Sequence, residues 1–225
     1  MNRYPMAPPW GRMAEVVIVR ECQHGQVRVV FGDLPQVEGD VMIVPANNRL
    51  AGREGLDERM QLAAGPELRE FCTEIAKERR KFNLQPCSVG EAVTTPAFNL
   101  PATHLVHVVG PDCRRPTQDN LRRELLKKSY EAMFEAVEKL DPRKTLVTPP
   151  LGMDVFAYPH REGARMTMEI VLEWMDAEDD PGVDMVLIVT NENNFLTNMK
   201  TVYRESEDRF PGVDRTREYR KGKFE

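Results

Sequence analysis

The second half of the sequence alternates short apolar runs with longer helical patterns, and this alternation limits the folds available to the chain. An apolar run at residues 144–151 precedes a helical pattern at 159–177, and a run at 184–191 precedes a helical pattern at 194–210. Strands that alternate with helices of this length form parallel β-α-β units. We therefore predict an α/β fold, a three-layer α/β/α sandwich with a mixed, mostly parallel sheet of about six to seven strands.

The first half supplies the other strands. Two β-branched runs, at residues 14–22 and 26–34, flank a turn at His24-Gly25 and are predicted to be antiparallel neighbours. The continuous apolar run DVMIVPAN at 40–47 is typical of a buried central strand. Further strands are expected at 90–100 and 104–112, and helices at 56–80, interrupted at Gly65-Pro66, and at 120–140, with Asn120 as the cap.

Length and composition predict one domain in a reducing compartment. The 225 residues fit a flexible leader at 1–13, a single domain at 14–210 and a charged, mobile tail at 211–225. A net charge of −5 argues against a general nucleic-acid binder. No apolar run is long enough to span a membrane, and the N-terminus lacks the features of an export signal, so we expect a cytoplasmic protein. The four cysteines are widely spaced, which is typical of reduced thiols.

Several common site types have no counterpart in the sequence. The phosphate-binding patterns GxxxxGK[ST] and GxGxxG are absent, as is the GxSxG pattern of serine hydrolases. His104 and His107 are three apart in a strand pattern, so they face opposite sides of the sheet and cannot share a metal ion. We predict no metal site and no cofactor.

Two loops are the best candidates for a binding site, because ligands of such folds bind outside the carboxyl ends of the strands. They span residues 45–57 and 149–159. In the first loop, Asn47 offers both donors and acceptors that suit sugar hydroxyls. Asp57 lies where a helix begins. It is either a helix cap or a carboxylate that faces the loop and accepts from a sugar hydroxyl or positions a water.

The sequence also contains six short motifs in a fixed order: GDL (32–34), PAN (45–47), GREGLD (52–57), AAGPEL (63–68), TPAFNLPATHLVHVVGP (95–111) and PPLGMDVFAYP (149–159). This series resembles the macrodomains, modules that bind ADP-ribose. The resemblance covers roughly residues 26–205. It implies a partner that is ADP-ribose or an ADP-ribosylated substrate.

The resemblance implies a role for each matching residue. Asp33 matches the acid that accepts from the adenine amino group, and Leu34 its neighbour whose backbone assists. Asn47 matches the asparagine that holds the distal ribose. Asp57 matches the aspartate of members that hydrolyse ADP-ribosyl esters, so Asn47 and Asp57 are the predicted catalytic pair. Phe156 is expected beside the distal ribose. The other predicted ligand-binding residues are Ala46, Gly52, Gly55 and Leu56 in the first loop, Gly152, Met153, Asp154, Val155 and Ala157 in the second loop, whose amides are expected to hold the diphosphate, and Thr190 and Asn191 near the adenine.

The chain departs from the family pattern at several of these places. The usual first asparagine, three residues before Asn47, is Val44. Arg53 and Glu54 replace two glycines of the first loop. In the second loop Gly152-Met153-Asp154 stands where the family has Ser-Thr-Gly or Gly-Thr-Gly, and Ala157 replaces a glycine. Thr190 takes the place of an aromatic residue, for which Phe195 is a candidate substitute.

Asp154 is the departure with the largest consequence, because it places a negative charge in a loop expected to hold a diphosphate. The sequence leaves three arrangements open. The carboxylate points to solvent, or Arg53 neutralises it, or the pocket no longer binds a diphosphate. Three functions stay open with them: an ADP-ribosyl hydrolase that acts on a modified acidic side chain or a small ester, a reader of ADP-ribose without chemistry, and an interaction module with a degenerate pocket.

Overall fold

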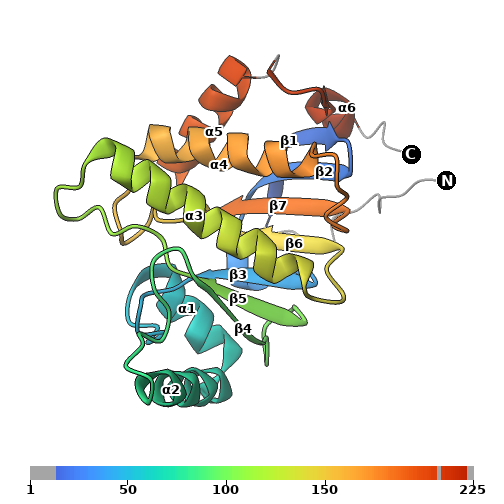
Figure 1. Ribbon diagram of the computed structural model, residues 1–225. Coiled ribbons are helices and arrows are strands. Elements are labelled where there is room, and N and C mark those ends of the chain that lie inside the picture. Colours follow the sequence, from blue (N-terminus) through green and yellow to red (C-terminus); the bar gives the residue numbers. More distant parts are fainter. Residues whose placement is uncertain (1–13, 207–208, 222–225) are drawn as a thin grey trace.

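The computed structural model describes residues 14–206 and 209–221, and within them the chain folds into one sheet covered by helices (Figure 1). The strands are β1 (Glu15–Cys22), β2 (Gly25–Phe31), β3 (Val41–Pro45), β4 (Ala92–Pro96), β5 (His104–Val108), β6 (Thr145–Thr148), β7 (Met185–Thr190) and β8 (Val213–Asp214). The helices are α1 (Gly55–Ala64), α2 (Pro66–Arg80), α3 (Asp119–Glu138), α4 (His160–Met175), α5 (Asn193–Ser206) and α6 (Thr216–Arg220).

The sheet is mixed, with a parallel centre and antiparallel edges. Its strand order is β4-β5-β3-β6-β7-β2-β1-β8. Strands β5, β3, β6, β7 and β2 pair in parallel, so their carboxyl ends meet at one edge of the sheet. Strand β1 is antiparallel to β2, as the turn at His24-Gly25 predicted.

The sheet has eight strands, more than the predicted six to seven, because the predicted tail contributes one. Val213 and Asp214 pair with Glu21 and Arg20 of β1, and the Arg215 N–H donates to the Val19 carbonyl at 2.9 Å. The described part of residues 211–225 therefore packs on the domain, and the predicted boundary at residue 210 does not hold there. The predicted leader at 1–13 lies outside the described residues.

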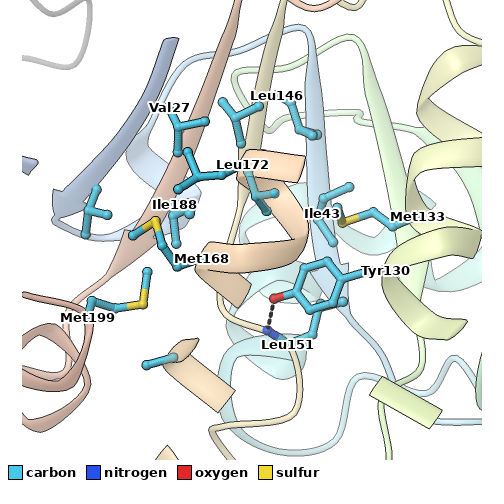
Figure 2. Packing of buried hydrophobic residues seen from close by; sticks show 14 of the residues in the cluster. Val27, Ile43, Tyr130, Met133, Leu146, Leu151, Met168, Leu172, Ile188 and Met199 are labelled. Carbon is cyan, nitrogen blue, oxygen red and sulfur yellow. Dashed lines mark hydrogen bonds between the residues drawn. The ribbon is translucent and has the colours of Figure 1, made fainter. Parts of the chain in front are cut away.

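Helices cover both faces of the sheet and bury a hydrophobic core on each, which confirms the three-layer sandwich. On one face, α3, α4 and α5 pack against alternate residues of the strands; Figure 2 shows Val27, Ile43 and Ile188 among them. On the other face, α1, α2 and α6 pack against the intervening residues. The alternation follows from the two-residue period of a strand.

Two local features of the helices differ in how well the sequence predicted them. The break between α1 and α2 lies at Gly65, whose φ of 97° only glycine adopts readily, and Pro66 opens α2 as predicted. The prediction of Asn120 as the cap of α3 is wrong, because the helix begins one residue earlier and its capping position is Gln118. In the described part of the chain, no helix has the length and apolar character needed to cross a membrane.

A buried tyrosine links the core to the loop after β6. The Tyr130 hydroxyl accepts a hydrogen bond from the Leu151 N–H at 3.2 Å (Figure 2). The same hydroxyl lies 2.8 Å from the Thr167 hydroxyl. Tyr130 is fully buried. The contact with Leu151 therefore fixes the chain just before residues 152–157, whose backbone was expected to hold a diphosphate.

Candidate functional site

A pocket of about 180 Å³ opens where the carboxyl ends of the parallel strands meet. Gly32 follows β2, Asn47 follows β3, Pro149 follows β6 and Thr190 ends β7. The pocket therefore lies where the strand arrangement predicted a ligand to bind.

The two loops predicted from the sequence form most of the wall. The predicted ranges were 45–57 and 149–159; since Pro45 ends β3, we call residues 46–57 the first loop, and we call residues 149–157 the second loop. The predicted residues that line the pocket are Leu34, Ala46, Asn47, Gly55, Leu56, Asp57, Gly152, Met153, Asp154, Val155, Phe156, Thr190 and Asn191.

Three predicted residues do not line the pocket. The Asp33 carboxylate forms an ion pair with Arg59 at the pocket rim. Gly52 is a buried residue of the first loop, and the adjacent Gln61 side chain leaves no room for a Cβ atom there. Ala157 ends the second loop with a φ of 52°, the left-handed conformation in which the family has a glycine. These two residues shape the loops, and Asp33 is engaged by an arginine that the sequence did not point to.

The Asn47 side chain organises the first loop. Its Oδ1 accepts hydrogen bonds from the Arg49 N–H at 2.9 Å and the Ala51 N–H at 3.3 Å. Its Nδ2 donates to Asp57 Oδ2 at 3.0 Å. Asn47 therefore fixes the loop and the carboxylate together, because all three contacts come from one amide group.

Asp57 is a buried carboxylate on the pocket wall. It is the third residue of α1, whose capping position is Glu54, so it is not the helix cap. Burial raises the pKa of Asp57 from 3.8 to about 6, and hydrogen bonds from the backbones of Asn47 and Gly52 and from the Asn47 side chain limit the increase. Its Oδ1 makes no hydrogen bond of ordinary geometry with the described residues. A buried carboxylate oxygen with no well-aligned donor, on a residue that lines a pocket, is suited to accept a hydrogen bond from a ligand hydroxyl or a water.

Asp154 bridges the two loops, an arrangement outside the three expected ones. Its side chain is exposed, yet Oδ2 accepts a hydrogen bond from the Leu56 N–H at 2.8 Å. Leu56 lies in the first turn of α1, where N–H groups have no partner within the helix. The carboxylate thus occupies an N–H group at the N-terminus of α1, a kind of group that otherwise suits a phosphate oxygen.

Gly55 allows the two loops to come this close. Its φ is 63°, and a Cβ atom at this position would lie 2.3 Å from Asp154 Oδ2 and 2.4 Å from Val155 Cγ2. Any larger residue at position 55 would push the second loop away.

Phe156 and Glu54 lie where the pocket meets a neighbouring hollow, which Arg114 and Asp112 line. The Arg114 guanidinium lies 5.4 Å from the centre of the Phe156 ring. Arg114 also pairs with Glu54 at 3.2 Å and with Asp112 at 2.6 Å. Side-chain hydrogen bonding to Arg114 lowers the pKa of Asp112 below its usual range. Phe156 therefore lines the pocket on one side and contacts a cation on the other.

Some lining residues were missed by the sequence reasoning. Gly110 follows β5, and Glu192 follows β7, so the rule about carboxyl strand ends would have found them had it been applied to every parallel strand. His160 opens α4 and lies 3.3 Å from the Asn194 amide. Phe195 lines the pocket and is buried, so it occupies a position from which it can replace the missing aromatic residue at Thr190.

Comparison with known protein families identifies the family of this chain. The family model described as Macro domain matches residues 43–167, more than half of the chain. The chain belongs to the macrodomain family. This confirms the resemblance read from the six motifs.

Relatives of this macrodomain include named enzymes. It is 30% identical over 172 residues to an O-acetyl-ADP-ribose deacetylase of Cronobacter sakazakii, a match that covers 76% of this chain and 91% of the relative. It is 30% identical over 182 residues to the ADP-ribose glycohydrolase MACROD1 of Rattus norvegicus, which covers 80% of this chain and 64% of the relative.

Solved macrodomain structures have a fold similar to that of this chain. The Oceanobacillus iheyensis macrodomain with ADP superimposes with a TM-score of 0.77 at 23% identity, covering 88% of this chain and 99% of that one. A Trypanosoma brucei macrodomain in complex with ADP-ribose has a TM-score of 0.65 at 22% identity and covers 78% of this chain and 68% of that one. These two likenesses support the fold.

Proposed function

We propose that this macrodomain binds ADP-ribose and hydrolyses the bond that joins it to a carboxylate, in an ADP-ribosylated acidic side chain or in a small ester. The observation that supports this most is the burial and the hydrogen bonding of the Asp57 carboxylate. It is buried on the pocket wall, one oxygen is held by Asn47, and the other has no hydrogen-bond partner of ordinary geometry among the described residues.

Asp57 has the properties of a general base for this reaction. With a pKa of about 6 the side chain is mostly ionised at neutral pH, and it is more basic than an ordinary aspartate. It takes a proton from the attacking water while the oxygen of that water forms a bond to the carbonyl carbon of the ester. The tetrahedral intermediate then collapses: the bond between that carbon and the ribose oxygen breaks, the departing ribose oxygen takes the proton from Asp57, and the carboxylic acid and ADP-ribose are the products. Asn47 acts as a positioning residue, since it touches the reacting centre through Asp57.

The rest of the pocket would hold the nucleotide. The N-termini of α1 and α4 both open at the pocket, and helix N-termini favour phosphate oxygens. Phe156 lies where a ring can pack on the distal ribose. Leu34, Thr190 and Asn191 line the end proposed for the adenine, with Phe195 as the aromatic contact.

A direct test compares binding with turnover. Calorimetry with ADP-ribose measures binding, and release of ADP-ribose from a peptide modified on glutamate, or from O-acetyl-ADP-ribose, measures turnover. We expect both in the parent chain. The Asp57→Asn variant keeps the shape and the contact to Asn47 but has no base, so we expect binding to persist and turnover to vanish. Turnover by this variant at the parent rate would refute the assignment.

The contact between Asp154 and Leu56 favours a second candidate, a macrodomain that serves as an interaction module. If the carboxylate stays on the Leu56 N–H, the first loop offers one amide fewer to a diphosphate. A ligand at 100 times its dissociation constant should stabilise the fold by about 2.7 kcal/mol. Failure of millimolar ADP-ribose, ADP and NAD to raise the melting temperature would therefore select this candidate.

We also propose a cytoplasmic location and no nucleic-acid partner. All four cysteines, Cys22, Cys72, Cys87 and Cys113, are free thiols, as a reducing compartment would leave them. The net charge of −5 disfavours general binding of nucleic acid.

A further inference from the structure

Two more hollows neighbour the pocket. Asn47, Glu54, Gly110 and Phe156 of the pocket also line a hollow of about 400 Å³. Its two carboxylates, Glu54 and Asp112, are both paired with Arg114, which lines it too. That hollow shares Arg49 and Arg53 with a groove of about 900 Å³. The groove runs between residues 48–53, one face of α2 and residues 84–86. We call it the α2 groove.

The α2 groove is strongly basic, although the chain as a whole is acidic. Arg49, Arg53, Arg69, Lys77 and Arg80 line it, with one carboxylate, from Glu58. Lys77 is paired with Glu74 at 2.6 Å. The four arginines are exposed and form no ion pair with any residue in the described part of the chain. A concave surface with several unpaired cations attracts an acidic partner.

The geometry of α2 shows what shape of partner fits. Arg69, Lys77 and Arg80 lie on one stripe of the helix, because they are spaced by eight and three residues. The stripe from 69 to 80 is about 16 Å long at 1.5 Å per residue. This length matches about five residues of an extended peptide at roughly 3.3 Å each. Glutamates at 70, 74 and 78 border the stripe on one side, so a single narrow chain fits it better than a nucleic-acid duplex.

We propose that the α2 groove binds an acidic segment of the ADP-ribosylated protein, next to the modified residue. This rests on the proposed function, because the acceptor is then attached to the distal ribose beside Phe156. The hollow that Arg49 and Arg53 line has residues in common with both the pocket and the groove, so it is the shortest route between them. The groove thus contributes to substrate choice: proteins modified within acidic segments are preferred over small esters.

The first experiment measures the affinity of the groove for an acidic peptide in the absence of ADP-ribose. A fluorescent decapeptide of alternating glutamate and glycine is titrated with the full chain at low salt, and anisotropy gives its affinity. Arg69→Gln together with Arg80→Gln should weaken binding roughly fivefold, since two exposed ion pairs are lost. The matched control is Arg204→Gln with Arg217→Gln, which removes two exposed arginines from α5 and α6, at the opposite end of the molecule from α2 (Figure 1).

We expect the control variant to bind the peptide like the parent and the binding to disappear at high salt. Absence of peptide binding by the parent would overturn the proposal, as would equal affinities of the groove and control variants. A single-stranded oligonucleotide of equal charge serves as a competitor. If it binds more tightly than the peptide and loses affinity in the groove variant, the groove is a nucleic-acid site and the proposal fails.

The second experiment uses substrate. With a peptide modified on glutamate and flanked by glutamates, the groove variant should show a KM about fivefold higher at unchanged kcat, for the same electrostatic reason. With O-acetyl-ADP-ribose it should match the parent. An equal loss on both substrates would contradict the groove. If the parent hydrolyses neither substrate, the proposed function fails, and the anisotropy result alone then decides whether the groove binds acidic peptides.

Discussion

Replacing Asp154 by asparagine should strengthen the binding of ADP-ribose. The Asp154 carboxylate accepts from the Leu56 N–H at 2.8 Å, in the first turn of α1. A diphosphate held by the two loops would approach the same N–H and meet this negative charge. Asparagine has nearly the same shape and retains an acceptor oxygen, so the loops keep their contact while the charge is removed.

The size of the effect follows from the distance and the exposure of the side chain. Two unit charges about 4 Å apart repel by about 1 kcal/mol in water and about 4 kcal/mol at an effective dielectric of 20. Asp154 is exposed, so the value lies near the lower end. Since each 1.4 kcal/mol is a factor of ten, we expect ADP-ribose to bind about tenfold more tightly to the variant. The fold loses a small part of a favourable charge–helix interaction, of the order of 0.5 kcal/mol.

Calorimetry with ADP-ribose and with adenosine checks this reasoning. Adenosine has no diphosphate, so its affinity should be the same in the parent and in Asp154→Asn. The gain for ADP-ribose should shrink as salt is added, because the side chain is exposed to the screening ions. If the variant binds ADP-ribose no better than the parent while adenosine binding is unchanged, the carboxylate does not oppose the diphosphate.

Three further predictions concern the Asp57 carboxylate on the pocket wall and Tyr130, which holds the start of the second loop. The pKa of Asp57 rises from 3.8 to about 6 on folding, so its negative charge destabilises the fold at pH 8. Asp57→Asn should therefore raise the free energy of unfolding at pH 8 by up to about 3 kcal/mol while turnover is lost. A melting temperature lower than the parent's would contradict this. The same raised pKa predicts that kcat/KM falls as pH drops through about 6, and a profile that stays flat down to pH 4.5 would exclude Asp57 as the base. Tyr130→Phe leaves the buried Leu151 N–H without an acceptor and should lower the free energy of unfolding, measured by chemical denaturation, by about 1–3 kcal/mol. The control Phe134→Leu, at the edge of the same core, keeps that hydrogen bond and should leave the affinity for ADP-ribose unchanged.

The sequence alone determined the fold class and the place of the site. Apolar runs that alternate with helical patterns require parallel strands, and parallel strands bring their carboxyl ends to one edge. Local chemistry also marked Gly65-Pro66 as the break between α1 and α2, and Asn47 and Asp57 as the polar residues of the first loop. Each of these features is specified by residues close together in the chain, so a local sequence pattern is enough to predict it.

Only the tertiary structure decided which partners the charged residues have. The contact of Asp154 with Leu56 joins residues 98 positions apart, and the pairing of Asp33 with Arg59 joins a strand end to a helix. The strand at Val213–Asp214 exists because the edge of β1 is available to it, not because its own two residues specify a strand. Likewise, the pKa of Asp57 is raised by burial, which results from the packing of the first loop on the sheet. Contacts between distant segments depend on where the whole chain places them, and no local pattern records that.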